Sequence, residues 1–507
     1  MLRRKQALVG LVALAVLALA GDVMVRRTDS SPVVRTINLS AVTMAVDEQA
    51  GHVVMAASDR NGGSLCVLDA HTGTILRRVA LRATVTPAGE FVPSSVLALD
   101  EPAQRAFVTT FDFSNGAAVK AYVNVVDLRS GILLRTVAAM RTLPLALAVD
   151  QRSERVVVVN GSVTIPWLRG RVVVLDVHSG AVLWTHSVGE AVAGVAVDQQ
   201  NSRAFVISQH TDRMGNPIGP GHVSVLDVAS GHILRTIDVA QNPYQLAVAA
   251  RSGRVFVLGG SGQSPYMGHV AMLDAQSGRL LRTVTAGDDS QALAVDEMTG
   301  RVFIMNAGRQ SGKGSVTILD ARTGSVVRTV AIQGIIMAMS VDTRHHHVFV
   351  AIEHRDGIGR STGPGSVSML DAHSGHILRT VAVGNYPTSM AVAASEARVF
   401  VVTVGVVDPM LQNLPMETGH VSVLDARNGS VLRTIPVGVA PSAIAVDERA
   451  HRAFVINRGD GIEEKGRPDT WRWVPGWLRQ RLPFLRQKGA RSIHVVPGTV
   501  TVIDTTR

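Results

Sequence analysis

Cysteine is almost absent from this chain of 507 residues, in which Cys66 is the only one. A single cysteine excludes an internal disulfide framework, a thiolate metal cluster and a haem-attachment motif, because each needs at least two. Aromatic residues make up only 4% of the sequence, whereas hydrophobic residues as a whole make up 46%. The core must therefore be built mainly from Val, Ala, Leu and Ile, and this Gly-rich, β-branched mixture favours strands joined by tight turns.

Lysine is also scarce, although the formal net charge is +10. Most of the conspicuous arginines occupy one place in a repeated "LRT"-like segment: Arg35, Arg77, Arg135, Arg235, Arg282, Arg328, Arg379 and Arg433. Charge that follows a repeat in this way indicates structural decoration, so nucleic acid is not an expected partner. A polyanion-binding surface stays open as an alternative.

The first 30 residues have the order of a secretory signal. Arg3, Arg4 and Lys5 precede an apolar run from Ala7 to Ala20, which ends in a small-x-small cleavage pattern. The run is short for a membrane span, and Asp22 interrupts its extension. We predict that residues 1–30 are a signal peptide or an N-terminal membrane anchor with a short linker, and that the protein is secreted or extracytoplasmic.

One line of sequence recurs along the chain with small changes. "VSMLDAHSGHILRTVAVG", from Val367 to Gly384, has close variants that begin at Val223, Val270 and Val421. Four segment types follow one another in fixed order ("LRTVAVG"-like, "AVD"-ending, "RVFV"-like and "VSVLD"-like), and each is typical of a short strand. Nine "AVD"-type and nine "VLD"-type segments, roughly 50 residues apart, fit four-stranded propeller blades.

The two ends of this array differ by one strand. The first recognisable strand, from Val33, is of the outermost type, whereas the last, ending at Asp504, is of the type that precedes it. Pairing them completes a ninth blade and removes the exposed edges of an open array. We therefore predict an all-β fold over residues 31–507: a single closed β-propeller of nine four-stranded antiparallel blades, closed by the N-terminal outer strand.

An aspartate opens the predicted turn between the third and fourth strands of eight blades. The pattern is Asp-x-x-Ser/Thr/Asn-Gly, in which Asp accepts downstream backbone N–H groups and Gly takes a positive φ. This structural role explains why aspartate recurs in these turns, so the repeated carboxylates do not indicate catalysis. The predicted structural turn residues are Asp69, Asp127, Asp176, Asp227, Asp274, Asp320, Asp371 and Asp425.

These motifs resemble the YVTN-type (YncE-like) β-propeller repeat family. The matching stretches are "RVFIMN" from Arg301, "RAFVIN" from Arg452 and "RVVVVN" from Arg155, with the repeated hairpins and "VGVAPSAIAVD" from Val437. The resemblance extends from Val33 to Asp504. It implies a bacterial or archaeal exported or surface protein, and it carries over no catalytic residue. The familiar form has seven blades, so nine repeats depart from it.

The loops of the predicted propeller fall on two faces. The turns after the first and third strands share the turn face and are short and uniform. The loops after the second strands and the links between blades share the loop face and vary most, as in the stretches from Ser208, Glu353 and Thr403. Because binding residues often lie on variable loops of a rigid scaffold, the loop face is the candidate binding face, with functionless insertions as the alternative.

The largest insertion, residues 458–497, is rich in tryptophan and arginine. Such a mixture is typical of protein hot spots and membrane interfaces, so this segment is a candidate interaction loop. The other interpretation is a structural lid that plugs the channel or covers a neighbouring blade. The candidate interaction residues are Trp471, Arg472, Trp473, Trp477, Arg479, Arg481 and Phe484. Contact with a membrane surface, through this loop or the N-terminal segment, is a further prediction.

Two classes of propeller enzyme are possible alternatives. Quinone-cofactor dehydrogenases use repeats similar to the one from Val172 to Gly189, where Trp184 matches their docking tryptophan, but Arg takes its place in the other repeats. Lactonase-type propellers need converging acid, base or metal-binding groups, and the pair Asp288 and Asp289 has no identifiable histidine partner. The run from His345 to His347 is not expected to hold one metal, because neighbouring strand residues point to opposite faces.

The sequence as a whole favours a non-enzymatic binding or scaffold protein. It would present its loop face to an unknown protein, glycan or cell-envelope component. We expect a monomer with no catalytic residue, no metal and no cofactor. A propeller enzyme of lactonase or quinoprotein type and a polyanion-binding surface protein are the alternatives.

Overall fold

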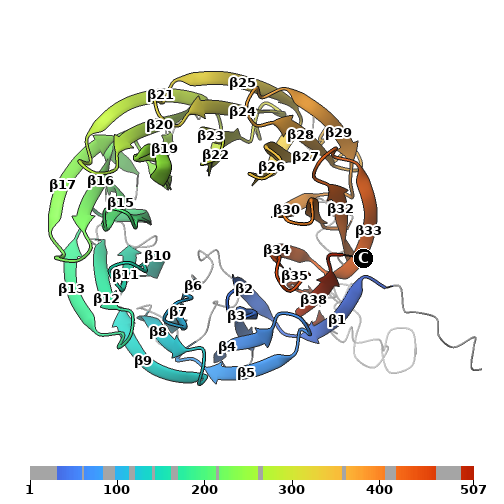
Figure 1. Ribbon diagram of the computed structural model, residues 1–507, viewed down its shortest axis with the longest axis horizontal. Coiled ribbons are helices and arrows are strands. Elements are labelled where there is room, and N and C mark those ends of the chain that lie inside the picture. Colours follow the sequence, from blue (N-terminus) through green and yellow to red (C-terminus); the bar gives the residue numbers. More distant parts are fainter. Residues whose placement is uncertain are drawn as a thin grey trace, which may run out of the picture.

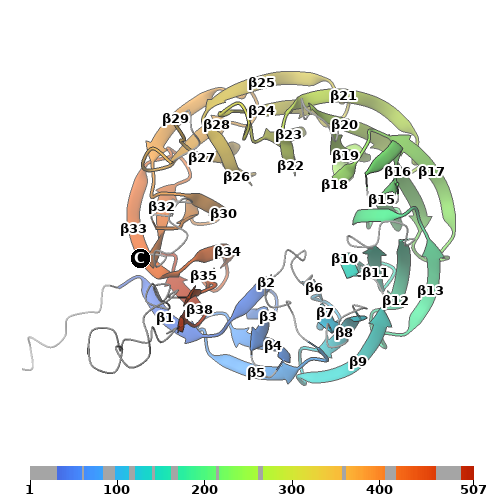
Figure 2. The ribbon, with the colours of Figure 1, turned by 180° about the vertical axis from the view of Figure 1, so that it is seen from behind.

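The chain forms a ring of nine β-sheets around a common axis (Figure 1). The computed structural model describes residues 31–506 apart from residues 60–61, 84–96, 113–119, 140–142, 162–169, 213–215, 261–266, 357–360, 406–417 and 464–492. Each sheet has four antiparallel strands, and the view from behind shows the same succession from axis to rim (Figure 2). The predicted all-β propeller of nine blades is confirmed.

In the first four blades the strands run in sequence order from the axis outward. Blade 1 is β2 (Ala41–Asp47), β3 (His52–Asp59), β4 (Gly62–Asp69) and β5 (Ile75–Ala80); blade 2 is β6 (Leu97–Asp100), β7 (Arg105–Asp112), β8 (Lys120–Asp127) and β9 (Ile132–Ala139). Blade 3 is β10 (Leu143–Asp150), β11 (Arg155–Gly161), β12 (Arg171–Asp176) and β13 (Val182–Ser187); blade 4 is β14 (Ala191–Asp198), β15 (Arg203–Thr211), β16 (Pro217–Asp227) and β17 (Ile233–Val239).

The next four blades repeat this plan. Blade 5 is β18 (Pro243–Ala249), β19 (Arg254–Gly260), β20 (Met267–Asp274) and β21 (Leu280–Asp288); blade 6 is β22 (Ser290–Asp296), β23 (Arg301–Asn306), β24 (Lys313–Asp320) and β25 (Val326–Gln333). Blade 7 is β26 (Ile335–Asp342), β27 (His347–Glu353), β28 (Ser366–Asp371) and β29 (Ile377–Ala382); blade 8 is β30 (Pro387–Ala393), β31 (Arg398–Thr403), β32 (Thr418–Asp425) and β33 (Val431–Val439).

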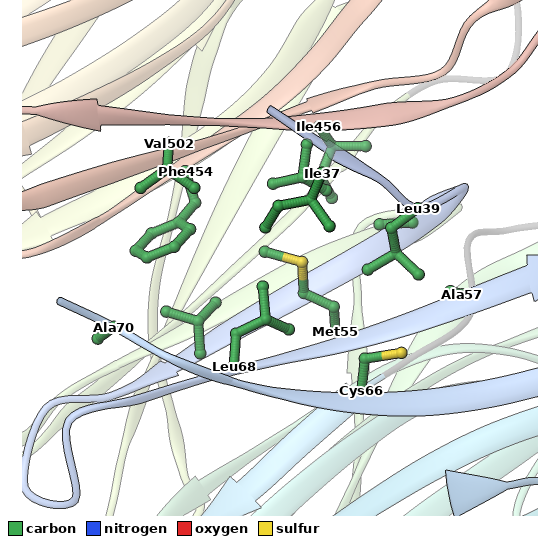
Figure 3. Packing of buried hydrophobic residues seen from close by; sticks show 13 residues of the cluster. Ile37, Leu39, Met55, Ala57, Cys66, Leu68, Ala70, Phe454, Ile456 and Val502 are labelled. Carbon is green, nitrogen blue, oxygen red and sulfur yellow. The ribbon is translucent and has the colours of Figure 1, made fainter. Parts of the chain in front are cut away.

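Blade 9 is built from both ends of the chain. It consists of β34 (Pro441–Asp447), β35 (Arg452–Asn457), β38 (Thr499–Asp504) and, outermost, β1 (Val33–Asn38). β1 is antiparallel to β38, with Ile37 opposite Val500. Figure 3 shows Ile37 between Ile456 of blade 9 and Met55 of blade 1, so the N-terminal strand also completes the core between these two blades. The predicted closure is consistent with this pairing.

Burial changes systematically from axis to rim. Apart from their ends, the second and third strands are buried, because neighbouring blades cover both of their faces, and they read as continuous Val-rich runs. The outermost strands are mostly exposed. In seven blades the third residue of the second strand is a fully buried phenylalanine that packs against a neighbouring blade: Phe107, Phe205, Phe256, Phe303, Phe349, Phe400 and Phe454. These seven phenylalanines therefore lie at the interfaces between blades.

Two further elements complete the described part of the chain. A 3-10 turn, η1 (Ala250–Ser252), joins β18 to β19, and the short hairpin of β36 (Asp460–Glu463) and β37 (Ile493–Val496) lies in the connection from β35 to β38. No helix among the described residues is long and apolar enough to cross a membrane.

The aspartates predicted for the turn after the third strand bind within that turn. Asp274 Oδ1, for example, accepts the backbone N–H of Ser277 at 2.9 Å and its hydroxyl at 2.8 Å. Asp274 also pairs with Arg254, at the start of β19, at 2.9 Å. The equivalent arginines at the start of β7, β11, β15 and β23 pair with the equivalent aspartates of their own blades.

In seven blades the turn after the first strand begins with a buried aspartate, and Ala249 and Ala393 take its place in blades 5 and 8. Asp296 accepts the backbone N–H groups of Met298 and Thr299 and the Thr299 hydroxyl. The residue before the second strand has a positive φ in all nine blades, at Gly51, Gln104, Glu154, Ser202, Gly253, Gly300, His346, Ala397 and His451. Its carbonyl accepts the N–H of the residue that follows the third strand, as from Ala321 to Gly300 at 2.9 Å. This bond links the two turns of each blade.

The glycine of the turn after the third strand packs against the blade before it. A Cβ on Gly278 would lie 2.8 Å from Val225 Cγ2 of blade 4. A Cβ on Gly231 would lie 2.6 Å from the nearest atom of the Trp184 ring, and one on Gly131 would lie 2.6 Å from Arg77 Cδ. Trp184 therefore packs on the turn glycine of the next blade, as the aliphatic part of Arg77 does on Gly131.

The outermost strand of every blade carries a β-bulge at the same place, one residue before the recurrent arginine or, in blade 3, before Trp184. Each extra residue is aliphatic and 42–50% exposed. We name these nine residues the rim belt: Val34, Leu76, Leu134, Leu183, Leu234, Leu281, Val327, Leu378 and Leu432.

Candidate functional site

The loop-face ends of the innermost strands differ in chemistry from blade to blade. Eight of these strands carry a bulge in their first residues, where one extra residue is inserted into the ladder. The extra residues are Val42, Leu145, Ala193, Tyr244, Gln291, Met337, Thr388 and Ser442. Bulges are common beside binding sites because they re-aim side chains. The inner end of the loop face is therefore the candidate site.

The links that enter the innermost strands are held in an unusual backbone conformation. Asp289, Tyr386 and Ala440 have φ between 51° and 53°, the left-handed region that non-glycine residues seldom occupy. Their carbonyl groups accept an N–H from the residue just past the second strand, from Ala307 to Asp289 at 2.8 Å for instance. These bonds fix the link, and with it the side chain that the link presents.

In blade 6 the link presents Asp289 to two polar groups. Its Oδ1 accepts Gln291 Nε2 at 2.5 Å, and its Oδ2 accepts the Arg309 backbone N–H at 3.2 Å. The Arg309 guanidinium approaches Oδ1 at 3.9 Å and is half exposed. Asp289, from the carboxylate pair in the sequence, thus orders an amide and a cation, while Asp288 ends the preceding outer strand.

Tyr244 closes this cluster from blade 5. Its hydroxyl donates to the Ser290 carbonyl. Burial of the phenol, with a smaller contribution from the charge of Asp289, raises the pKa of Tyr244 to about 12. Tyr244 is therefore a neutral hydrogen-bond donor at physiological pH and cannot act there as a general base.

Blades 7 and 8 hold a second ordered cation. Arg355 makes two parallel bonds to the buried carboxylate of Glu353, from Nε and from Nη2, each 2.9 Å long. Nη2 also donates to the Tyr386 hydroxyl at 3.0 Å. The bond to Glu353 raises the pKa of Arg355, and burial together with Glu353 raises the pKa of Tyr386. The bidentate geometry keeps the guanidinium charged and fixed.

A third network joins blades 4 and 5. Gln209 accepts the N–H of the link residue Asn242 at 2.7 Å, and its amide donates to the carbonyls of His210 and Ile218. Glu190 accepts the Thr211 N–H at 2.8 Å. Sequence reasoning did not find Gln209, Tyr244 and Arg355, because none of them belongs to a motif. The available signal was their position near the loop-face end of a second strand or at a link.

One serine and histidine pair lies at this face. His354 Nε2 is 2.9 Å from Ser366 Oγ. Ser366 is buried, and no bond from another described residue orients the second ring nitrogen of His354. The geometry is that of a bond across the base of a loop, without the oriented base that an activated serine needs.

The predicted interaction loop lies largely outside the described residues. Trp471, Arg472, Trp473, Trp477, Arg479, Arg481 and Phe484 all fall within 464–492. The structure does describe how this segment leaves the ring: β36 and β37 pair with Glu463 opposite Ile493, next to blade 9. The segment therefore begins and ends on a paired stalk.

The three adjacent histidines do not converge. His345 Nδ1 bonds Asp342, His347 Nδ1 bonds the Ala426 carbonyl, and the His346 ring lies 5.2 Å from that of His373. Within the described ranges, no group of three or more His, Cys, Asp or Glu side chains has an arrangement that could hold a metal ion.

The fold and this site define a nine-bladed β-propeller with a uniform turn face and a variable loop face. The family described as outer membrane protein assembly factor BamB matches residues 14–237 and 119–351, which together span about two thirds of the chain. The chain belongs to this family. No curated protein matches it.

Several solved structures resemble this chain over most of its length. One titled "Crystal structure of the eukaryotic initiation factor" has a TM-score of 0.53 and 11% identity, covering 80% of this chain and 89% of that one. The Dos1 propeller has a TM-score of 0.51 and 13% identity, covering 73% and 90%. Quinohemoprotein alcohol dehydrogenase from Comamonas testosteroni has a TM-score of 0.50 and 14% identity, covering 94% and 76%. At these identities the likeness shows the fold alone.

Proposed function

We propose that this protein is an extracytoplasmic, non-enzymatic binding or scaffold protein of the cell envelope, which holds a partner at its loop face. The observation that carries the proposal is the contrast between the two faces. The turn face repeats the same two kinds of turn around the ring, whereas the loop face changes its side chains, its loop lengths and its ordered cations from blade to blade.

Family membership supports the envelope location, since the matching family is described as an outer membrane protein assembly factor. The finer kinship with YVTN-type repeats, the signal or anchor role of residues 1–30 and the monomeric state are parts of the same proposal. The partner is a protein or another envelope component, and segment 464–492 contacts it together with the clusters around Arg309 and Arg355. Trp and Arg side chains are common anchors of such contacts.

The β36–β37 stalk allows a clean test. Residues 464–492 are replaced by Asn-Gly, a two-residue turn that suits strands paired from Glu463 to Ile493. The matched control replaces the same residues by a Gly/Ser stretch of equal length. Native mass spectrometry of complexes recovered from the host envelope reads out the partner.

We expect both variants to lose the partner and to keep the thermal stability of the wild-type chain. A partner retained by both variants would contradict the role of the segment, and a lower melting temperature in both would identify it as a structural lid. A tightly held small molecule in the wild-type protein would favour an enzyme of quinoprotein or lactonase type. Loss of the partner at moderate salt alone would favour polyanion binding.

A further inference from the structure

The rim belt has a feature that the fold does not require. A bulge and a neighbouring charge already protect an outer strand from pairing with another chain, and a polar residue at the bulge would serve this purpose equally well. Instead all nine bulge residues are aliphatic and nearly half exposed. In seven blades the residue before the bulge is a second exposed aliphatic side chain, such as Ile377 before Leu378. Apolar surface of this extent is typical of an interaction surface.

The charge beside the belt is mainly positive. In eight blades an arginine directly follows the bulge residue, and the nine outer strands contain only two acidic residues, Asp238 and Asp288. Aliphatic side chains next to basic ones are the combination that binds anionic lipid surfaces, where apolar burial and headgroup attraction add.

The uniformity of the belt indicates what kind of partner it fits. A protein partner of fixed shape would select one arc of the rim, and that arc would differ from the others. A lipid surface is fluid and can accept any arc. We propose that the rim of this propeller docks edge-on to an anionic lipid surface, with rim-belt side chains in the interfacial region and the adjacent arginines at the phosphate groups.

The rim is hollowed between blades 2 and 3. A cavity of about 130 Å³ lies there, lined by eight residues of which only Thr185 has a polar side chain. Val182, at its outer edge, directly precedes the rim-belt residue Leu183. The cavity is partly open to the surface and its lining is apolar, so it can take a few methylene groups at the end of an acyl chain.

The first test compares variants of the full chain in flotation with vesicles of phosphatidylglycerol or phosphatidylcholine. All variants keep residues 1–30, so differences between them report the ring alone. Changing every rim-belt residue to Thr should weaken binding to phosphatidylglycerol at least tenfold. The control I218T/M298T changes two equally exposed apolar side chains away from the rim and should change binding less than twofold. The wild-type chain should bind phosphatidylcholine more weakly, and added salt should weaken its binding to phosphatidylglycerol.

A second measurement does not depend on the multiple variant folding. Cys66 is buried, so an environment-sensitive fluorophore on L234C labels the rim, and one on I218C labels the control site. The probe at position 234 should shift to the blue with phosphatidylglycerol vesicles, and the one at 218 should not. Equal shifts at both positions, or full vesicle binding by the rim-belt variant, would overturn the proposal. Self-association that the rim-belt variant abolishes, with unchanged vesicle binding, would assign the belt to a second copy of the chain.

Discussion

The two turns of each blade solve the same backbone problem in different surroundings. Both begin with an aspartate that accepts downstream N–H groups, except that Ala249 and Ala393 begin the first of the two turns in blades 5 and 8. Both also need a residue with positive φ. After the first strand this residue is Gly in only three blades, and a Cβ on those glycines would meet nothing within 4 Å. After the third strand it is Gly in all eight continuous turns, and a Cβ there would collide with the preceding blade or press tightly on it.

The difference shows that contact with the neighbouring blade, more than φ, restricts the second turn to glycine. A left-handed conformation alone costs about 1–2 kcal/mol for an ordinary residue, which the first turn accepts with Gln, Glu, Ser, His or Ala. A Cβ in the second turn would add overlap with a packed side chain, and that cost is not relieved without moving a blade.

The largest expected effect comes from two matched Gly→Ala substitutions, which separate the cost of positive φ from the cost of overlap with the neighbouring blade. G278A places a Cβ 2.8 Å from Val225 Cγ2, whereas G300A has the same kind of φ and open space. We expect G278A to lower the free energy of unfolding by about 3 kcal/mol and G300A by about 1 kcal/mol in urea titrations. Equal losses of unfolding free energy in the two variants would show that positive φ alone makes alanine unfavourable at position 278.

The same comparison can be sharpened with a double-mutant cycle. V225A removes the methyl groups that the new Cβ would meet, so V225A/G278A should be more stable than the sum of the two single changes predicts by at least 1 kcal/mol. Strict additivity would indicate that the strain arises within the turn.

For the aspartates, we expect the larger loss of stability in the turn after the first strand. Asp296 is fully buried and accepts two backbone N–H groups and a hydroxyl, whereas Asp274 is partly exposed and accepts one backbone N–H, a hydroxyl and the Arg254 guanidinium. D296A should cost about 2–3 kcal/mol, because it leaves backbone donors without their acceptor, and D274A about 1 kcal/mol. Thermal melts of both variants at pH 7 measure the difference, and a larger loss for D274A would refute it.

The partly exposed aspartates predict an acid limit of stability. Hydrogen bonds from the Ser three residues downstream hold the pKa values of Asp176, Asp274 and Asp371 below the ordinary value, with a smaller contribution from a neighbouring cation. A lowered folded-state pKa contributes stability above the unfolded value near 3.9, and this contribution is lost as the pH falls through the folded-state value. Between about pH 5 and 2 the variant D176N/D274N/D371N should lose less stability than wild type, and parallel curves would contradict this cause.

The smallest expected effect concerns a left-handed residue of the open turn. Glu154 has φ 56°, and its exposed carboxylate lies 4.0 Å from the exposed ring of His178. E154G relieves the conformational cost but adds freedom to the unfolded chain, so a net gain of about 0.5 kcal/mol is expected. The matched change G131A, in the packed turn of blade 2, should be clearly destabilising in the same melts.

The repeats predict the ring because a short stretch of sequence specifies each type of strand and turn. Asp-x-x-Ser-Gly specifies a turn by itself, and the unequal ends of the array indicate how blade 9 closes. The sequence could not predict that position 278 requires glycine, because this requirement comes from contact with Val225 of another blade. The left-handed Gln104 and Ser202 carry no turn signal in their residue types.

The site was harder to predict than the ring. Asp289 was visible as part of a carboxylate pair, but its partners Gln291 and Arg309 come together only through the link geometry. The rim belt was hidden for another reason: a bulge shifts the alternation by one residue, so that Ile377 and Leu378 read as an ordinary strand.

The pairing of β1 with β38 also sets an order of assembly. Eight blades can form from consecutive strands as soon as each has been made, but blade 9 needs strands from opposite ends of the polypeptide. Contacts so distant in sequence form late, because the loop between them must first be ordered. A chain that stops short of Thr499 would leave β1 without its neighbour and the core beside Met55 open to water. Closure of the ring therefore requires β1 and β38, the first and last strands of the array, to be present together.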